Sequence, residues 1–206
     1  MKQIWTLGIR DKRLISIISK ILKSEIKGEG IPTKGTPQGG IISPTLANIA
    51  LNGIEKALSG FKQTTRNGVA YNPKVSLIRY ADDFIITGAS KEILENEVKP
   101  ILVEFFQERG LELSEEKTVI THVSEGFDFL GFNVRKYNGT LLTKPSKKSV
   151  KKLTEKVKVL LKSHRAVKQE EILMMLNPIL TGWSMYYRYC AASETFRKTD
   201  QKNIQL

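Results

Sequence analysis

The fold is decided by the stretch Leu77-Ile-Arg-Tyr-Ala-Asp-Asp-Phe-Ile-Ile-Thr87, in which two adjacent acids interrupt an apolar run. The residues on either side predict strands at 75–80 and 84–87, joined as a hairpin by Ala81-Asp82-Asp83. Asp is a poor strand former and neighbouring like charges repel, so the pair costs folding free energy unless something offsets it. A turn with two solvated acids is the simpler interpretation, but such a turn usually carries Gly or Asn. The apolar flanks therefore favour a functional pair.

The chemistry that suits two carboxylates at a hairpin tip is divalent metal binding. Mg²⁺ prefers hard oxygen ligands, keeps several waters and also takes substrate phosphates. Two such ions about 4 Å apart can hold the attacking and leaving oxygens of an in-line phosphoryl displacement. We therefore expect Asp82 and Asp83 to be Mg²⁺ ligands in a phosphoryl-transfer site.

Helical and strand patterns alternate along the rest of the chain. Helical spacing of apolar residues predicts helices at 11–27, 43–58 and 92–109, and again from residue 146 onward. Shorter apolar runs predict strands at 111–113, 118–122, 127–134 and 140–143. This mixture predicts an α+β fold, with a small, mainly antiparallel sheet and flanking helices.

The composition favours a protein with a polyanionic partner and excludes disulfide-rich and membrane-spanning classes. The 206 residues carry a formal net charge of +12, which favours a polyanionic partner. The single cysteine, Cys190, excludes an intramolecular disulfide and fits a reducing compartment, so we expect a cytoplasmic protein. No apolar run reaches the roughly 18 residues of a membrane span, so we expect no membrane partner.

The positive charge is concentrated toward the C-terminus. Residues 1–135 hold 18 Lys and Arg against 16 Asp and Glu, whereas residues 136–206 hold 15 against 5. This asymmetry predicts a near-neutral globular domain joined to a basic, nucleic-acid-binding one. The turn-rich stretch 136–140 contains Asn-Gly and precedes Pro145, so we place the domains at 1–140 and 141–206.

The helix expected after residue 146 combines an apolar stripe with lysines that lie mostly away from it. Five of these lysines are candidate nucleic-acid-binding residues: Lys147, Lys148, Lys151, Lys152 and Lys156. They can follow a phosphate backbone without reading sequence, or they can form a solvated helix face. Further along, the residues Trp183, Tyr186, Tyr187 and Tyr189 either stack on bases or pack between helices. Both alternatives remain open for each group.

Two segments resemble the reverse transcriptases. Tyr80-Ala81-Asp82-Asp83 resembles their catalytic hairpin. The upstream segment Gly35-Thr-Pro-Gln-Gly-Gly-Ile-Ile-Ser-Pro-Thr-Leu-Ala-Asn-Ile-Ala-Leu51 resembles the palm of group II intron and related bacterial enzymes. Glycine lets backbone approach a nucleotide closely, and an amide such as Gln38 can hydrogen-bond base or sugar edges. The resemblance implies nucleotide and template binding by Gln38, Gly39, Gly40, Asn48 and Tyr80.

Downstream segments extend the resemblance to roughly residues 8–190. Leu113-Ser-Glu-Glu-Lys-Thr118 is similar to the next palm motif, which implies that Lys117 is a catalytic group near the incoming triphosphate. Phe127-Asp-Phe-Leu-Gly-Phe-Asn-Val134 is similar to the hairpin that supports the primer terminus, which makes Gly131 a primer-grip residue. Lys144-Pro-Ser-Lys-Lys-Ser149 and Leu176-Asn-Pro-Ile-Leu-Thr-Gly-Trp-Ser-Met-Tyr-Tyr187 are similar to the helical thumb, or maturase domain, of group II intron proteins.

The resemblance implies RNA-directed DNA synthesis with two Mg²⁺ ions. Its partners would be intron or template RNA, primer DNA and deoxynucleoside triphosphates. In that family a third carboxylate comes from an earlier palm strand, and nothing before Gly35 fits it, because Asp11 lies at a basic helix start. We therefore expect a later palm plus thumb, to be completed by a missing N-terminal half or a second copy. Two hypotheses remain: a reverse transcriptase, or a catalytically silent RNA-binding module that assists intron splicing. For this polypeptide alone the second is favoured.

Overall fold

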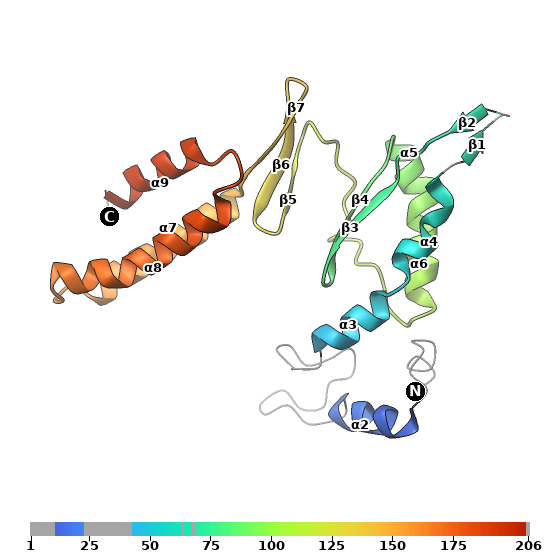
Figure 1. Cartoon of the computed structure of the whole chain (residues 1–206), viewed down its shortest axis with the longest axis horizontal. Helices are drawn as coiled ribbons and strands as arrows, with labels where there is room; N and C mark the ends of the chain where they lie inside the picture. The colour runs from blue at the N-terminus through green and yellow to red at the C-terminus, as the bar shows by residue number, and fades with distance from the viewer. Residues whose placement is uncertain (1–10, 23–42, 63, 67–68, 205–206) are drawn as a thin grey trace. The chain divides into compact units, whose positions relative to one another are not determined.

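The computed structural model describes residues 11–22, 43–62, 64–66 and 69–204. The chain divides into two compact units, Met1–Ile120 and Thr121–Leu206. Both units mix helices with small antiparallel sheets, so the expected α+β class is confirmed (Figure 1). The domain division at residues 140 and 141 stays a prediction.

The expected hairpin is present in the first unit. Strands β3 (Ser76–Tyr80) and β4 (Asp83–Thr87) pair antiparallel, from Ser76 opposite Thr87 to Tyr80 opposite Asp83. The connection is therefore a two-residue turn, and its first residue, Ala81, has a φ of 55°. Such left-handed backbone matches the twist of the flanking strands in a tight hairpin. The turn places Asp82 at the tip and Asp83 at the first position of β4.

The described residues of the first unit form more helix than strand. Its elements in chain order are α2 (Lys12–Leu22), α3 (Ser43–Leu51), α4 (Ile54–Ala57), η1 (Ser59–Lys62), β1 (Thr64–Arg66), β2 (Val69–Tyr71), the β3–β4 hairpin, α5 (Lys91–Ile93), η2 (Leu94–Val98) and α6 (Lys99–Gln107). Helix α2 begins as the sequence predicts, because Asp11 Oδ1 accepts the backbone N–H of Arg13 and of Leu14. The helix expected at 43–58 is instead divided at Gly53, which has a φ of 94°.

One apolar cluster joins the helices of this unit to the hairpin. Its buried members are Leu51, Ile54, Leu58, Phe61, Ile93, Val98, Leu102, Phe105 and Phe106. Leu77, Phe84 and Ile86 from one face of the hairpin pack against it. Because side chains alternate along a strand, the other face, which carries Ile78 and Tyr80, stays exposed. The core thus supports the hairpin from one side only.

The predictions of two strands are wrong. Residues 111–113 and 118–122 form no strand. The N–H of Leu111 bonds to the carbonyl of Phe106 and closes the end of α6, while Thr118 N–H bonds to Ser114 O across a turn. A short apolar run becomes a strand only where a partner strand supplies backbone hydrogen bonds. Where no partner strand is present, as here, the backbone groups bond to nearby residues of the chain instead.

The second unit contains a three-stranded sheet of β5 (Phe127–Phe129), β6 (Phe132–Tyr137) and β7 (Thr140–Pro145). Residues 127–134, a single strand by apolar alternation and a hairpin by the family resemblance, form a hairpin, since Phe129 lies opposite Phe132 and the turn is Leu130-Gly131. Both turn residues have positive φ, 50° and 82°. A second hairpin turns at Asn138-Gly139 and pairs β6 with β7. The alternation of apolar residues predicted strand character but not the reversal.

Three helices follow: α7 (Lys147–Ser163), α8 (Gln169–Tyr187) and α9 (Ser193–Ile204). Helix α7 contacts both α8 and α9 (Figure 1). It begins at Ser146, whose side chain accepts the N–H of Ser149 as an N-cap. Its expected apolar stripe is confirmed at Leu153 and Val157, which are buried.

Tyr187 connects the sheet to the helices. Its ring is 2 % exposed, and its hydroxyl lies 3.0 Å from the carbonyl oxygen of Gly131 and 2.6 Å from Ser149 Oγ. The N–H of Ser146 donates to the same Gly131 carbonyl at 2.8 Å. Burial raises the pKa of the Tyr187 phenol above its ordinary value, because the neutral hydroxyl is favoured over the phenolate in this apolar setting. This contact fixes the β5–β6 turn against α8.

The close approach at Gly131 predicts a stability difference between two glycines. Gly131 and Gly139 both have left-handed backbone, with φ of 82° and 88°. A Cβ at Gly131 would lie 2.7 Å from the Tyr187 hydroxyl, whereas a Cβ at Gly139 meets nothing within 4 Å. Gly139→Ala should lower the free energy of unfolding by about 1–2 kcal/mol through backbone strain alone. Gly131→Ala should lower it further, as measured by urea denaturation.

Gly139→Ala is the matched control, because it imposes the same backbone strain without the clash. Equal losses for the two variants would contradict the close packing of Tyr187 on the β5–β6 turn.

Candidate functional site

The two adjacent carboxylates stand at the exposed end of the β3–β4 hairpin. Asp82 and Asp83 are both exposed, and the neighbouring Tyr80 is 65 % exposed. Within the described part of the chain, neither carboxylate makes an ion pair. The described residues also contain no cluster of three or more His, Cys, Asp or Glu side chains suited to a metal ion. The tip therefore presents two carboxylates to solvent.

Arg79 links the tip of the hairpin to helices α3 and α4. Its Nη1 donates to Asn48 Oδ1 on α3 at 3.0 Å and to the carbonyl of Ala81 in the turn at 3.1 Å. Its Nε lies 3.6 Å from Glu55 Oε1 on α4. That Nε is buried and has no hydrogen-bond partner among the described residues, so the ion pair with Glu55 offsets its desolvation only in part. Arg79 thus sets where the turn lies relative to α3.

Arg79 is a functional candidate that the sequence analysis missed. The signal was available in the alternation of β3, because Arg79 shares a strand face with the core residue Leu77. A charged side chain on the inward face of a short strand indicates a specific partner. The structure shows those partners, and it brings Asn48, predicted to bind nucleotide, next to the carboxylate turn.

The donor set at the tip suits Mg²⁺ but is incomplete for two ions. Two exposed carboxylates offer hard oxygen ligands, and Mg²⁺ commonly takes one or two protein carboxylates and completes its shell with waters and phosphates. A two-metal site needs further ligands. Asp82 and Asp83 would hold the ion, and the bound ion would neutralise charge that develops on a transferred phosphoryl group.

Other predicted residues lie apart from this tip or outside the described part of the chain. Gln38, Gly39 and Gly40 lie outside the described residues, so nucleotide and template binding by them stays a prediction. Lys117 is exposed in a turn that follows α6. Its placement near a triphosphate stays a prediction as well.

Gly131, the predicted primer-grip residue, belongs to the second unit and has a structural role there. Its carbonyl is already engaged by Ser146 N–H and by the Tyr187 hydroxyl. Contact between a primer and this turn would therefore involve other atoms of the turn. The primer-grip role remains an expectation from the resemblance.

The predicted nucleic-acid-binding lysines are all on the exposed surface of α7. Lys147, Lys148, Lys151, Lys152 and Lys156 are exposed, away from the buried stripe. The first turn of α7 contains two of these lysines and no acid. Positive charge near a helix N-terminus is unfavourable, because the helix dipole is positive at that end. The two lysines of the first turn therefore do not serve stability, which favours an external anion as their partner, whereas Lys151 Nζ lies 3.8 Å from Glu155 Oε1.

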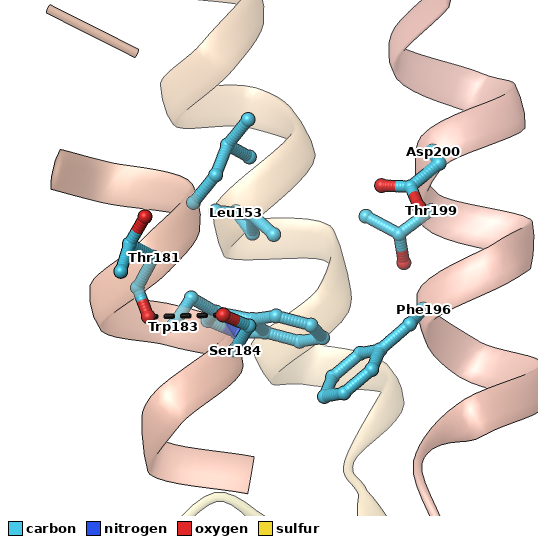
Figure 2. A pocket seen from close by; sticks show the side chains of 8 residues that line it. Leu153, Thr181, Trp183, Ser184, Phe196, Thr199 and Asp200 are labelled. Atoms are coloured by element: carbon cyan, nitrogen blue, oxygen red, sulfur yellow. Dashed lines mark hydrogen bonds between the residues drawn. The ribbon is translucent and has the colours of Figure 1, made fainter. Parts of the chain in front are cut away.

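The C-terminal aromatic residues divide between packing and exposure. Trp183 lies in a hollow of about 240 Å³ between α7, α8 and α9, with Phe196 and Leu153 beside it (Figure 2). Its Nε1 donates to Ser149 Oγ at 3.2 Å, and its ring meets Phe196 edge-on at 5.6 Å. Trp183 and Tyr187 thus pack within the unit. Tyr186 stacks on Phe132 but is half exposed, and Tyr189 is 84 % exposed.

No helix in the described part of the chain is both long enough and apolar enough to cross a membrane.

Sequence comparison identifies two known families along the chain. Residues 1–134 match the family described as reverse transcriptase (RNA-dependent DNA polymerase). Residues 150–203 match the family described as group II intron, maturase-specific domain. The two matches therefore include the hairpin that carries Asp82 and Asp83 and most of α7 to α9.

Individual relatives agree with this assignment. Protein YkfC of Escherichia coli (strain K12) is 31 % identical over 151 residues, which cover 60 % of this chain and 39 % of that protein. The group II intron-encoded protein LtrA of Lactococcus lactis subsp. cremoris is 27 % identical over 218 residues, covering 79 % of this chain and 36 % of that protein. The aligned part thus spans less than two-fifths of these relatives. The chain belongs to the reverse transcriptase (RNA-dependent DNA polymerase) family, and its C-terminal part is a group II intron maturase-specific domain.

Proposed function

We propose that this chain serves RNA-directed DNA synthesis of the group II intron type. The observation that carries the proposal is the pair of exposed carboxylates on a two-residue hairpin turn that Arg79 positions beside α3. In this proposal Asp82 and Asp83 hold Mg²⁺ for nucleotidyl transfer. Tyr80 and Asn48 line the nucleotide site together with Gln38, Gly39 and Gly40. Lys117 is the catalytic group near the triphosphate, and deoxynucleoside triphosphates and primer DNA are the substrates.

The basic surface of α7 supplies the second part of the proposal. Its exposed lysines bind intron or template RNA through phosphates, as maturase function requires. By itself, this chain acts as an RNA-binding module, because two carboxylates do not complete a two-metal site. In the proposed palm and thumb arrangement the first unit provides the metal ligands and the second holds the nucleic acid. A further polypeptide or a second copy completes the catalytic centre.

Metal binding at the tip can be tested without catalysis. Mn²⁺, a paramagnetic substitute for Mg²⁺, should broaden the backbone NMR signals of residues near Asp82 and Asp83 selectively and at weak affinity, because few ligands are present. Asp82→Asn together with Asp83→Asn should abolish the broadening. Asp200→Asn, which removes an exposed acid of α9, is the control and should leave it unchanged. Broadening that survives the double substitution would refute the metal assignment.

Primer extension tests whether the chain alone is catalytic. With Mg²⁺, deoxynucleoside triphosphates and a primed RNA template, the isolated chain should give no processive synthesis, since in-line displacement needs a complete two-metal geometry. Extension above background that disappears in Asp82→Asn would show that this chain, alone or as a homo-oligomer, completes the site.

RNA binding should depend on salt and on the lysines of α7. The affinity for a structured RNA should fall as salt rises, with a log-log slope of about −0.9 per phosphate contact on duplex DNA and a comparable one on RNA. Replacing Lys147, Lys148, Lys151 and Lys152 by Gln should weaken binding similarly across RNA sequences and make that slope shallower. Fluorescence anisotropy over a salt series measures both quantities.

The melting temperature of the same variant serves as its control. Removal of two lysines from the first turn of α7 relieves an unfavourable interaction with the helix dipole, which offsets the loss of the exposed Lys151–Glu155 ion pair, so the variant should melt close to wild type. An unchanged affinity and slope in a folded variant would assign these lysines to a solvated face.

A further inference from the structure

One face of the β6–β7 hairpin carries a cluster of cations around an aromatic ring. Phe132, on β6, stacks on Tyr186 of α8, and Pro145, opposite it on β7, is buried. Because side chains alternate along a strand, Arg135 and Tyr137 lie on the other face of β6, and Lys144 lies on the same face of β7. This face is therefore distinct from the one that packs on the helices.

Arg135 is held in place by three contacts. Its Nε donates to the carbonyl of Ser124 at 2.7 Å, and its guanidinium carbon lies 5.1 Å from the centre of the Tyr137 ring. Gly126, with a φ of 84°, packs so closely that a Cβ there would lie 2.8 Å from the Cβ of Arg135. Among the residues that the structure describes, the two Nη atoms have no hydrogen-bond partner. The free edge of the guanidinium is thus pre-oriented.

Lys144 brings a second positive charge to the same ring. Its Nζ lies 4.9 Å from the centre of Tyr137, so the two cations are at most about 10 Å apart, a separation comparable to the Debye length of about 8 Å at physiological salt. Attraction to the ring offsets part of their mutual repulsion. The ring therefore holds two like charges close together.

The nearby acids do not neutralise this pair. Asp128, across the sheet, accepts a hydrogen bond from Asn133 Nδ2 at 2.8 Å. Lys198 Nζ donates to Glu194 Oε1 at 2.6 Å, and this hydrogen bond is the main reason that the pKa of Glu194 lies below its ordinary value. The charge of Lys144 lowers that pKa by a smaller amount. Among the described residues, neither Arg135 nor Lys144 forms an ion pair. The described residues thus leave both cations of the cluster without an ion-pair partner.

We propose that Arg135, Tyr137 and Lys144 form a binding site for the phosphate backbone of a nucleic acid, additional to the lysines of α7. A guanidinium fork held by its Nε and by an aromatic face can make two parallel hydrogen bonds to one phosphate, and Lys144 adds a charge for the neighbouring one. This inference rests on the nucleic-acid binding proposed above and assigns a second, pre-oriented contact to it.

The test exploits the difference between a guanidinium and an ammonium. Affinity of the full chain for a labelled structured RNA is measured at one moderate salt concentration. Arg135→Lys keeps the charge but loses the fork and the bond to Ser124, so the affinity should fall about tenfold, the size of one charge-assisted contact. Lys144→Gln, which removes no hydrogen bond that the structure shows, should also weaken binding.

A matched control lies on the same strand. Lys136 is exposed and on the opposite face of β6, so Lys136→Gln loses one charge without touching the site and should change affinity less than twofold. Tyr137→Phe should keep the affinity, and Tyr137→Leu should lower it, because only the former retains the ring face. Melting temperatures establish that each variant is folded. If the Tyr137 variants unfold, the affinities of Arg135→Lys and Lys144→Gln for RNA decide whether the site exists.

The outcomes separate this inference from the proposed function. The site would be overturned if Arg135→Lys kept wild-type affinity and Lys136→Gln lost as much affinity as Lys144→Gln. That result would show diffuse electrostatic attraction, and RNA binding by the lysines of α7 would still stand. Loss of binding to phosphatidylserine vesicles but not to RNA in Arg135→Lys would assign the site to a lipid surface and overturn it too. No RNA binding by the wild-type chain would refute both proposals.

Discussion

In the first unit, the position of the carboxylate turn depends on one half-buried charge. Arg79 points from β3 toward the core side of the hairpin, where it reaches Asn48 on α3, Glu55 on α4 and the Ala81 carbonyl in the turn. A charge in such a place is unfavourable unless its partners are fixed, and each partner belongs to a different element. The interaction therefore couples the position of the carboxylate turn to both helices. Asp82 and Asp83 can stay exposed because this anchoring lies beneath them.

The second unit uses a neutral hydroxyl for the same purpose. Tyr187 bridges the β5–β6 turn and the start of α7, and Gly131 leaves just enough space for its hydroxyl. Trp183, Tyr186 and Phe132 surround this polar contact between the sheet and helices α7 and α8, and the Tyr186 hydroxyl adds a hydrogen bond to the carbonyl of Leu130. The candidate lysines of α7 and Arg135 are exposed and lie outside this contact, whereas Tyr137 and Lys144 are half-buried.

At several positions, like charges lie close together and lower the stability of the folded protein. Two adjacent acids occupy a tight turn, two lysines occupy the first turn of α7, and Arg135 and Lys144 share one aromatic ring. Each arrangement brings like charges together where an oppositely charged ligand would relieve the repulsion. A metal ion suits the first position and phosphates suit the other two. These are the ligands that the proposed function assigns to the three positions.

The sequence by itself determined the β3–β4 hairpin, the long helices and the family, because apolar periodicity and a distinctive motif are local properties of the chain. It also predicted the exposed lysines of α7, since a lysine off an apolar stripe has only solvent to face. Tertiary structure alone decided whether residues 111–113 and 118–122 would be strands, because a strand requires a partner. Tertiary structure also decided the roles of Arg79, Gly131 and Arg135. Their partners Asn48, Tyr187 and Ser124 lie 31, 56 and 11 residues away, and only folding brings such side chains together.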